Sequence, residues 1–205
     1  MNPYIIAIEF CSRVLIENIF QEENRIEQLR KDLIQAEQRA RNSEFDFNNE
    51  SMLEDPNELK LQKSYIAAMR GRENVSNLSN QVKELELTIL AKQVSINSLA
   101  MALLQTAKQG ISIVHQNLQN CPNGRLVKKS EYLKNIIWQG RNQAMHYEEG
   151  NYNQDVIQCF NNLSLVDPTL DLQRYGNKSK AKEIIDLLDW RTYEAYEQDM
   201  NSILK

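Results

Sequence analysis

The chain is poor in the residues that interrupt helices. Its 205 residues include only 6 glycines and 4 prolines. So little of either leaves few tight turns, which predicts long helices. No segment alternates polar and apolar residues over a useful length, so we expect no strands and an all-α fold.

Cysteine is scarce as well. Cys11, Cys121 and Cys159 are odd in number and far apart, and no C-x-x-C pair occurs. This spacing argues against a cysteine zinc site and favours reduced thiols in a cytoplasmic protein. We expect neither a metal nor another cofactor.

Long apolar runs are also missing. The first twenty residues are apolar, but Glu9, Arg13 and Glu17 interrupt them, which argues against a signal peptide. No window of about 18 consecutive apolar residues exists, so we expect no membrane span and no membrane partner. The net charge of −4 excludes a uniformly basic nucleic-acid binder but permits a local basic patch.

What the chain does contain is two long heptad patterns. The first half of the N-terminal pattern is apolar on several faces, which predicts burial in a helical body. The second half, residues 21–42, is apolar on one stripe only and is expected to project. The stripe comprises Ile5, Ile8, Leu15, Ile19, Ile26, Leu29, Leu33, Ala36 and Ala40, and the additional apolar positions are Ile6, Phe10, Cys11, Val14, Ile16 and Phe20.

The second heptad pattern starts after a polar segment, residues 42–57, which we interpret as a loop. It predicts either one helix from about Glu58 to about Gln119 or two helices that part near Lys92–Ser95. The simplest geometry is an antiparallel, coiled-coil-like hairpin whose tip, Ser43–Pro56, should be sensitive to protease. The stripe comprises Val75, Leu78, Val82, Leu85, Ile89, Ile96, Leu99, Leu103, Ala107, Ile111, Val114 and Leu118.

Shorter helices follow the turn "CPNG" at 121–124. One is expected from near Leu126 to near His146. Three residues can cap the next ones: Asn153, Ser179 (through Leu188) and Thr192. The segment 167–179 is interpreted as a loop. The whole chain, 1–205, is then a single all-α domain with a projecting hairpin (21–75), a core (94–165) and C-terminal helices (179–205).

The segment "GRNQAMHYEEG", residues 140–150, contains the pattern R-x-x-x-x-H, with Asn142 directly after Arg141 and one of only two histidines, His146. This resembles the signature of the HEPN superfamily, over roughly residues 94–165. The resemblance implies a HEPN-like helical bundle and a metal-independent endoribonuclease of the kind found in toxin–antitoxin, abortive-infection and CRISPR-type defence. It implies Arg141, Asn142 and His146 as catalytic residues, RNA as substrate and an antitoxin or other protein as a partner.

One departure from the family pattern concerns regulation. In one branch the histidine is followed by any residue and then by a tyrosine that the antitoxin modifies. Here Tyr147 follows His146 directly and Glu148 occupies the later position. That modification is therefore not expected in this chain.

The chemistry of the motif agrees with RNA cleavage. A histidine can take or give a proton near neutral pH, while arginine stays cationic and can clamp a phosphate. Asn142 can hold the imidazole or orient the phosphate. One motif offers a single histidine for the two roles of acid and base, and the resemblance supplies the solution: a two-fold homodimer, which should bury residues 126–160. Five positions on a regular helix turn by about 140°, so Arg141 and His146 share a face only if the helix ends or distorts between them.

Charge around the motif supports an RNA partner. Between residues 121 and 142 five cations face a single acid, Glu131. Such a patch suits a phosphate backbone. The predicted RNA-binding residues are Arg125, Lys128, Lys129, Lys134 and Tyr147, with Tyr132 and Trp138 as further aromatic candidates that are more often core than stacking platforms.

Two other interpretations stay open. In one, the motif is only a polar helix end whose arginine pairs with Glu148 or Glu149. In the other, the protein is a non-catalytic HEPN-like module that binds partners through its hairpin or senses a nucleotide at the dimer groove. His115 and Trp190 are expected to be structural, and Cys159 to be a buried small hydrophobic residue.

Overall fold

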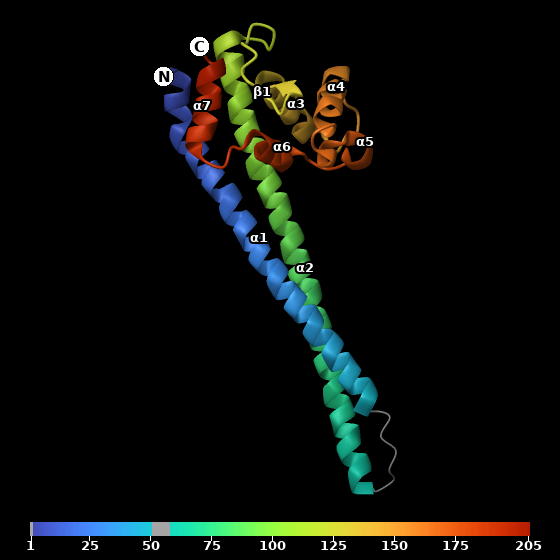
Figure 1. Cartoon of the computed structure of the whole chain (residues 1–205). Coiled ribbons are helices and arrows are strands. Elements are labelled where there is room, and N and C mark those ends of the chain that lie inside the picture. Colours follow the sequence, from blue (N-terminus) through green and yellow to red (C-terminus); the bar gives the residue numbers. More distant parts are fainter. Residues whose placement is uncertain (1, 51–57) are drawn as a thin grey trace. The chain divides into compact units, whose positions relative to one another are not determined.

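A computed structural model describes residues 2–50 and 58–205, with side chains described for residues 2–42, 66 and 69–205 (Figure 1). Two long helices come first, and a group of short elements follows. All-α architecture is confirmed, with one minute two-stranded sheet as the exception. The elements in order are α1 (Pro3–Glu50), α2 (Glu58–His115), β1 (Leu126–Val127), β2 (Glu131–Tyr132), α3 (Leu133–His146), α4 (Gln154–Ser164), η1 (Pro168–Leu170), α5 (Leu172–Tyr175), α6 (Ala181–Leu188) and α7 (Tyr193–Ile203).

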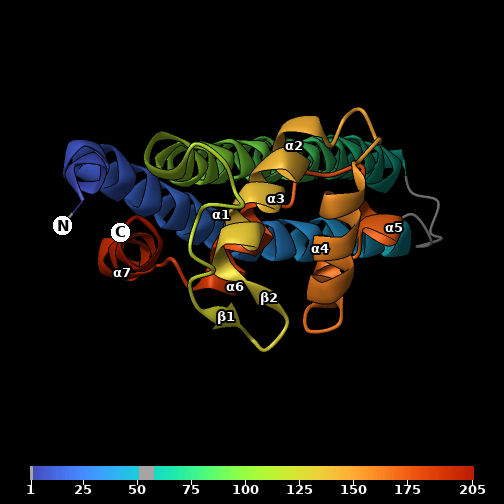
Figure 2. The same cartoon turned by 90° about the horizontal axis from the view of Figure 1, so that it is seen from above.

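The chain divides into two compact units, Met1–Glu23 with Val94–Lys205, and Asn24–Gln93. In the second unit, segments of α1 and α2 run side by side (Figures 1 and 2). The heptad residues Ile26, Ala36 and Ile89 are buried there. The heptads therefore act as packing stripes in this unit.

The structure corrects one prediction about the long helices and decides between two alternatives for the second of them. The loop predicted from residue 42 is wrong in its first part, because α1 continues to Glu50. Residues 51–57, which include the end of the predicted tip, lie outside the described residues. Of the two alternatives for the second heptad, one helix is correct, since α2 passes Lys92–Ser95 without a break.

The N-terminal helix is less buried than its apolar composition predicts. Ile6, Phe10 and Val14 are 58%, 81% and 36% exposed, and Cys11 is exposed as well. Positions 6, 10 and 14 are spaced by four residues and therefore form one stripe. The prediction that the first half of this helix is buried on several faces is thus wrong for this stripe.

In the first unit, the beginning of α1, the end of α2 and α7 lie together (Figures 1 and 2). The Asn2 side chain donates to the carbonyl of Leu204 at 2.7 Å. His115 Nε2 lies 2.7 Å from the carbonyl oxygen of Ile203, so the predicted structural role of this histidine is confirmed. Trp190 is fully buried, as predicted.

The expectation of no strands is wrong between residues 126 and 132. β1 and β2 pair antiparallel, so α3 begins at Leu133 and not near Leu126. The turn bends because Lys128 and Lys129 both adopt positive φ, 46° and 59°. The Ser130 amide donates to the carbonyl of Val127 at 2.9 Å, and this bond closes the turn. Two lysines in this conformation give no sequence signal for a hairpin, which usually comes from Asn-Gly.

Two of the three caps predicted for the C-terminal helices are confirmed, and the third is displaced by one residue. Asn153 and Thr192 accept hydrogen bonds from backbone amides of α4 and α7, as expected. α6 starts at Ala181 with Lys180 as its first flanking residue, while the Ser179 hydroxyl accepts from the Ala181 amide at 3.4 Å. The segment predicted as a loop contains the short helices η1 and α5.

One helical segment among the described residues, Met69–His115, is long and apolar enough to span a membrane by length and composition. Its most apolar window has a mean hydropathy of 1.5, and 28% of that window is buried in the structure. A search for strictly apolar runs overlooks this window. The absence of a membrane span therefore stays a prediction.

The cysteines give a direct test of the packing. Cys11 is exposed, whereas Cys121 and Cys159 are buried, as predicted for Cys159. Burial raises the pKa of the Cys121 thiol to about 11 and raises that of Cys159 further. Because the thiolate is the reactive form, we expect a thiol reagent at pH 8 to label one cysteine per native chain and three in denaturant. Mass spectrometry should place the native label on Cys11, and rapid native labelling of Cys159 would contradict this packing.

Candidate functional site

Helix α3 carries the motif and packs against both α4 and α6. Its inward side is mostly apolar, with Gln139 and Gln143 buried as well, and it ends at His146, shortly before Gly150, which adopts φ +68°. An early end to this helix was predicted, and it is confirmed. The buried apolar residues that fix its orientation are Leu133, Ile136, Ile137, Gly140 and Ala144.

Arg141 is half-buried and held by amides. Its Nε donates to Gln105 Oε1 on α2 at 2.6 Å, and its Nη1 donates to Asn142 Oδ1 at 3.3 Å. The alternative in which this arginine pairs with Glu148 or Glu149 is not what the structure has. Neutral acceptors fix the guanidinium in position while leaving its charge uncompensated.

A second cation lies close to Arg141. The pKa of Lys108 on α2 is lowered by partial burial and, to a smaller extent, by the positive charge of Arg141. Lys108 Nζ lies 4.3 Å from the centre of the Trp138 ring. Within the described part of the chain neither cation forms a salt bridge. Like charges placed together without an acid form a site that attracts an anion.

Gln105 and Lys108 were missed by the sequence analysis. They lie more than thirty positions before the motif, within a helix recognised only by its apolar stripe. No local signal in the sequence connects them to Arg141. Only the packing of α2 near α3 brings them together, as the hydrogen bond from Arg141 to Gln105 shows.

Asn142 links the arginine to a further amide. Its Oδ1 accepts from Arg141, and its Nδ2 donates to Gln139 Oε1 at 3.2 Å. Neither of these bonds involves His146. The predicted contact of Asn142 with the imidazole is therefore absent, its predicted role of orienting a phosphate stays a prediction, and its contacts position the Arg141 side chain.

His146 stands at the exposed end of α3. Its Nδ1 lies 2.8 Å from Glu149 Oε1, and the two side chains are 48% and 64% exposed. A carboxylate at Nδ1 favours the proton on that nitrogen, which leaves Nε2 as the basic atom. Glu149, first considered as a partner of the arginine, therefore orients the imidazole.

Arg141 and His146 are not brought together within one chain. α3 is continuous through His146, so the two positions differ by about 140° around its axis. Arg141 contacts α2, whereas His146 contacts the segment after α3. Each chain thus presents the two groups in different directions.

Arg125 is bound by other groups of the protein, although its side chain is 44% exposed. It forms a two-pronged contact with Asp199, at 2.7 Å from Nε and 2.8 Å from Nη2, and it also donates to the Leu188 carbonyl. The indole of Trp190 donates to the same carboxylate at 2.8 Å. This network ties the segment before β1 to α7, so the contacts of Arg125 are those of a structural residue.

The other predicted RNA-binding residues differ in availability. Lys128 and Lys129 are exposed at the hairpin turn. Lys134 donates to the Cys121 carbonyl at 2.8 Å. The Tyr147 hydroxyl donates to Glu148, and this hydrogen bond is the main cause of its raised pKa. Tyr132 is 41% exposed, so its predicted core position is wrong.

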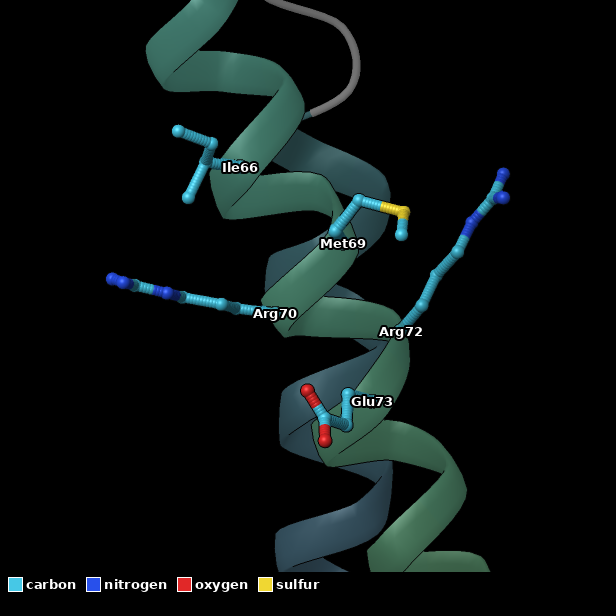
Figure 3. A pocket seen from close by; sticks show the side chains of 5 residues that line it. All are labelled: Ile66, Met69, Arg70, Arg72 and Glu73. Carbon is cyan, nitrogen blue, oxygen red and sulfur yellow. The ribbon is translucent and has the colours of Figure 1, made fainter.

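Each of the two compact units contains a hollow among its described residues. One, of about 330 Å³, lies between α3, α4 and the segment after α2, and Gln139 is part of its wall. The other, of about 600 Å³, lies on α2 in the Asn24–Gln93 unit, where Arg70 and Arg72 point away from each other (Figure 3). Nothing in this second hollow converges on one point. Among the described residues no cluster of three or more His, Cys, Asp or Glu side chains could hold a metal.

Comparison of the chain with protein-family models, curated proteins and solved structures gives no match.

Proposed function

We propose that this protein is a metal-independent endoribonuclease of HEPN type, with a composite Arg/His site formed across a homodimer. In this proposal residues 94–165 form the core of a HEPN-like bundle, and the long helices form an antiparallel hairpin. The observation that carries the proposal is a pair of cations, Lys108 on α2 and Arg141 on α3, whose charge is not neutralised by an acid among the described residues. His146 is on α3 as well.

The cation pair is the phosphate-binding part of the site. A guanidinium fixed by Gln105 and Asn142 keeps its remaining N–H donors for a ligand, and it has no reorganisation cost when the ligand arrives. Lys108 adds a second positive charge. Together they stabilise the negative charge that grows on a phosphate in the transition state.

His146 is the proton-transferring part. With Glu149 at Nδ1, Nε2 can accept the proton of a ribose 2′-hydroxyl, whose oxygen then attacks the adjacent phosphorus. The bond from phosphorus to the 5′-oxygen breaks, and that oxygen needs a proton. A second His146, in its protonated form, supplies this proton from the partner protomer.

A dimer is required because each chain points its arginine and its histidine in different directions. An exposed apolar side chain at the motif supports such an interface. Met145 is 45% exposed directly beside His146 in the chain. A two-fold axis near this surface would face the two motifs.

The biological setting follows from the resemblance. A cytoplasmic ribonuclease that cuts cellular RNA needs restraint, so we propose a role in toxin–antitoxin, abortive-infection or CRISPR-like defence with a protein antitoxin as partner. RNA is the substrate. Incubation of the purified protein with bulk RNA in EDTA is the first test, since cleavage by this mechanism survives chelation.

Arg141→Ala tests the phosphate site. It removes one fixed cation, so we expect RNA affinity to fall roughly ten- to hundredfold, the worth of a hydrogen bond to a charged group. The slope of log affinity against log salt should shrink by about one. Fluorescence anisotropy with a labelled single-stranded RNA measures both quantities.

The matched control for this variant is Arg174→Ala. That arginine, on α5, is 74% exposed and makes a weak contact with Asp171, so its loss changes the net charge by the same amount on a different helix. The control should keep nearly full affinity. Equal losses for the two variants would mean that only overall charge matters and that Arg141 has no special site.

A second candidate function is favoured by the exposed stripe Ile6, Phe10 and Val14 on α1. Large exposed apolar side chains often mark protein-binding surfaces. This supports the non-catalytic interaction module. An absence of RNA cleavage by wild-type protein under all conditions tested would favour it over the ribonuclease.

A further inference from the structure

The hollow of about 330 Å³ beside the motif has four neutral amides among its nine lining residues. Its volume is at the small end of ligand pockets, which span about 300–1,000 Å³. It therefore has room for one flat ring system and not for a nucleic-acid helix. The amides come from three elements: Gln119 from the segment after α2, Asn135 and Gln139 from α3, and Gln158 from α4.

Internal hydrogen bonds decide which lining groups remain for a ligand. Both oxygens of Glu131 already accept from the protein, one from Asn135 Nδ2 and the other from Asn162 Nδ2. Gln139 Oε1 accepts from Asn142. What is left on these residues is the Oδ1 acceptor of Asn135 and the Nε2 donor of Gln139.

Three further side chains supply complete polar groups. Gln119, Gln158 and Asp155 line the hollow, and their side chains form no hydrogen bond or ion pair with another described residue. Asp155 can only accept hydrogen bonds when it is ionised. The wall thus offers at least two acceptors, the exposed Asp155 carboxylate and Asn135 Oδ1, beside amide donors.

The charge of the lining selects against a phosphate at this position. Lys134 is its single cation, while Glu131 and Asp155 are acids. A neutral ligand with its own amino donor next to an acceptor fits better than an anion. Asn, Gln and Asp side chains recognise nucleobases through this kind of edge pairing.

The hollow is connected to the motif along one face of α3. Asn135, Gln139, Asn142 and His146 are spaced by four, three and four residues, which places them on a single stripe. Gln139 and His146 are separated by about 10 Å along the helix axis. A base held in the hollow therefore leaves its neighbouring nucleotide within reach of the imidazole.

The geometry points to a base-recognition subsite in this hollow, selective for a nucleobase that carries an exocyclic amino group. It rests on the proposed function for its role in RNA cleavage, but base binding itself does not require catalysis. The amino group donates to Asp155 and Asn135, and a ring nitrogen accepts from Gln139 or Gln158. Cleavage would then favour a fixed position relative to adenine, cytosine or guanine over uracil.

The test is isothermal titration of the full-length protein with two matched nucleoside pairs. Adenosine and inosine differ by an amino group replaced with a carbonyl, and so do cytidine and uridine. We expect adenosine and cytidine to bind roughly ten- to hundredfold more tightly than inosine and uridine, the worth of a hydrogen bond to a charged group such as the Asp155 carboxylate. Equal affinity within both pairs, or no binding of any nucleoside, would overturn the subsite.

A pair of variants assigns the binding to this place. Gln158→Leu removes an exposed lining amide without disturbing an internal contact, whereas Gln154→Leu changes an exposed glutamine of the same helix outside the hollow. We expect Gln158→Leu to weaken adenosine binding severalfold and Gln154→Leu to leave it unchanged. If the two variants bind adenosine alike, the assignment to this hollow fails.

RNA cleavage, measured on the same samples, separates this inference from the proposed function. His146-dependent cleavage without nucleoside binding would refute the proposed subsite and support the ribonuclease. Selective nucleoside binding without any cleavage would end the ribonuclease and leave a base-binding pocket.

Discussion

Replacing His146 with alanine should lower the rate of RNA cleavage by roughly two to four orders of magnitude, the usual worth of a positioned acid or base. Binding of RNA should change little, because the phosphate contacts belong to Arg141 and Lys108. The fold should also survive, since the His146–Glu149 pair is exposed on both sides and such pairs contribute little to stability. Single-turnover cleavage and anisotropy, both in EDTA, measure the two quantities separately.

Mixed dimers sharpen this result. A dimer of one Arg141→Ala chain and one His146→Ala chain retains one intact histidine and one intact arginine. If the site is composite, its activity should differ from the mean of the two parent variants. A parallel, equal loss of binding and cleavage in both parents would instead indicate a structural motif at the interface and would remove the catalytic assignment.

Replacing Asp199 with alanine should cost about 2–4 kcal/mol of unfolding free energy. The carboxylate is almost fully buried and receives hydrogen bonds from Arg125 and Trp190. Its removal leaves a buried indole N–H and a partly buried guanidinium without their acceptor, which costs more than the contact itself is worth. Urea denaturation followed by circular dichroism should show a lower midpoint.

Glu194→Ala is the matched control on the same helix. That carboxylate pairs with Arg13, and their side chains are 68% and 42% exposed. An exposed ion pair contributes little, so the midpoint should stay close to that of wild type. Comparable losses in the two variants would show that the Asp199 network is no more important than a surface pair.

Helix ends were predicted well where neighbouring residues in the sequence determine them. Asn153 and Thr192 were identified as caps because a capping side chain needs only the next three residues. The end of α3 near His146 was predicted from Gly150 for the same reason. The β-hairpin was missed, since two lysines with positive φ depend on tertiary anchoring and carry no turn signature.

Burial was harder to predict than helicity. Phe10 belongs to a strongly apolar stretch, yet it is 81% exposed, because periodicity shows which residues share a face and not whether another element covers it. The basic patch around the motif was likewise predicted only from the number of cations in residues 121–142. Counting could not show that Arg125 is bound to Asp199, which lies 74 positions away.

The motif residues could be selected from the sequence, but their contacts could not. Arg141, Asn142 and His146 belong to one short helix, so a local pattern was enough to select them. Gln105 and Lys108 approach through the packing of a separate helix. Their role follows only from contacts between elements distant in the chain.

The positive φ angles of Lys128 and Lys129 strain the hairpin turn, and this strain affects which substitutions would stabilise the protein. A lysine in the left-handed region is strained by about 1 kcal/mol relative to glycine or asparagine there. Replacing the pair with Asn-Gly would relax the backbone and remove two exposed cations at once. A substitution that stabilises this turn therefore also removes positive charge. A variant selected for thermal resistance would tend to lose the charges of Lys128 and Lys129 first.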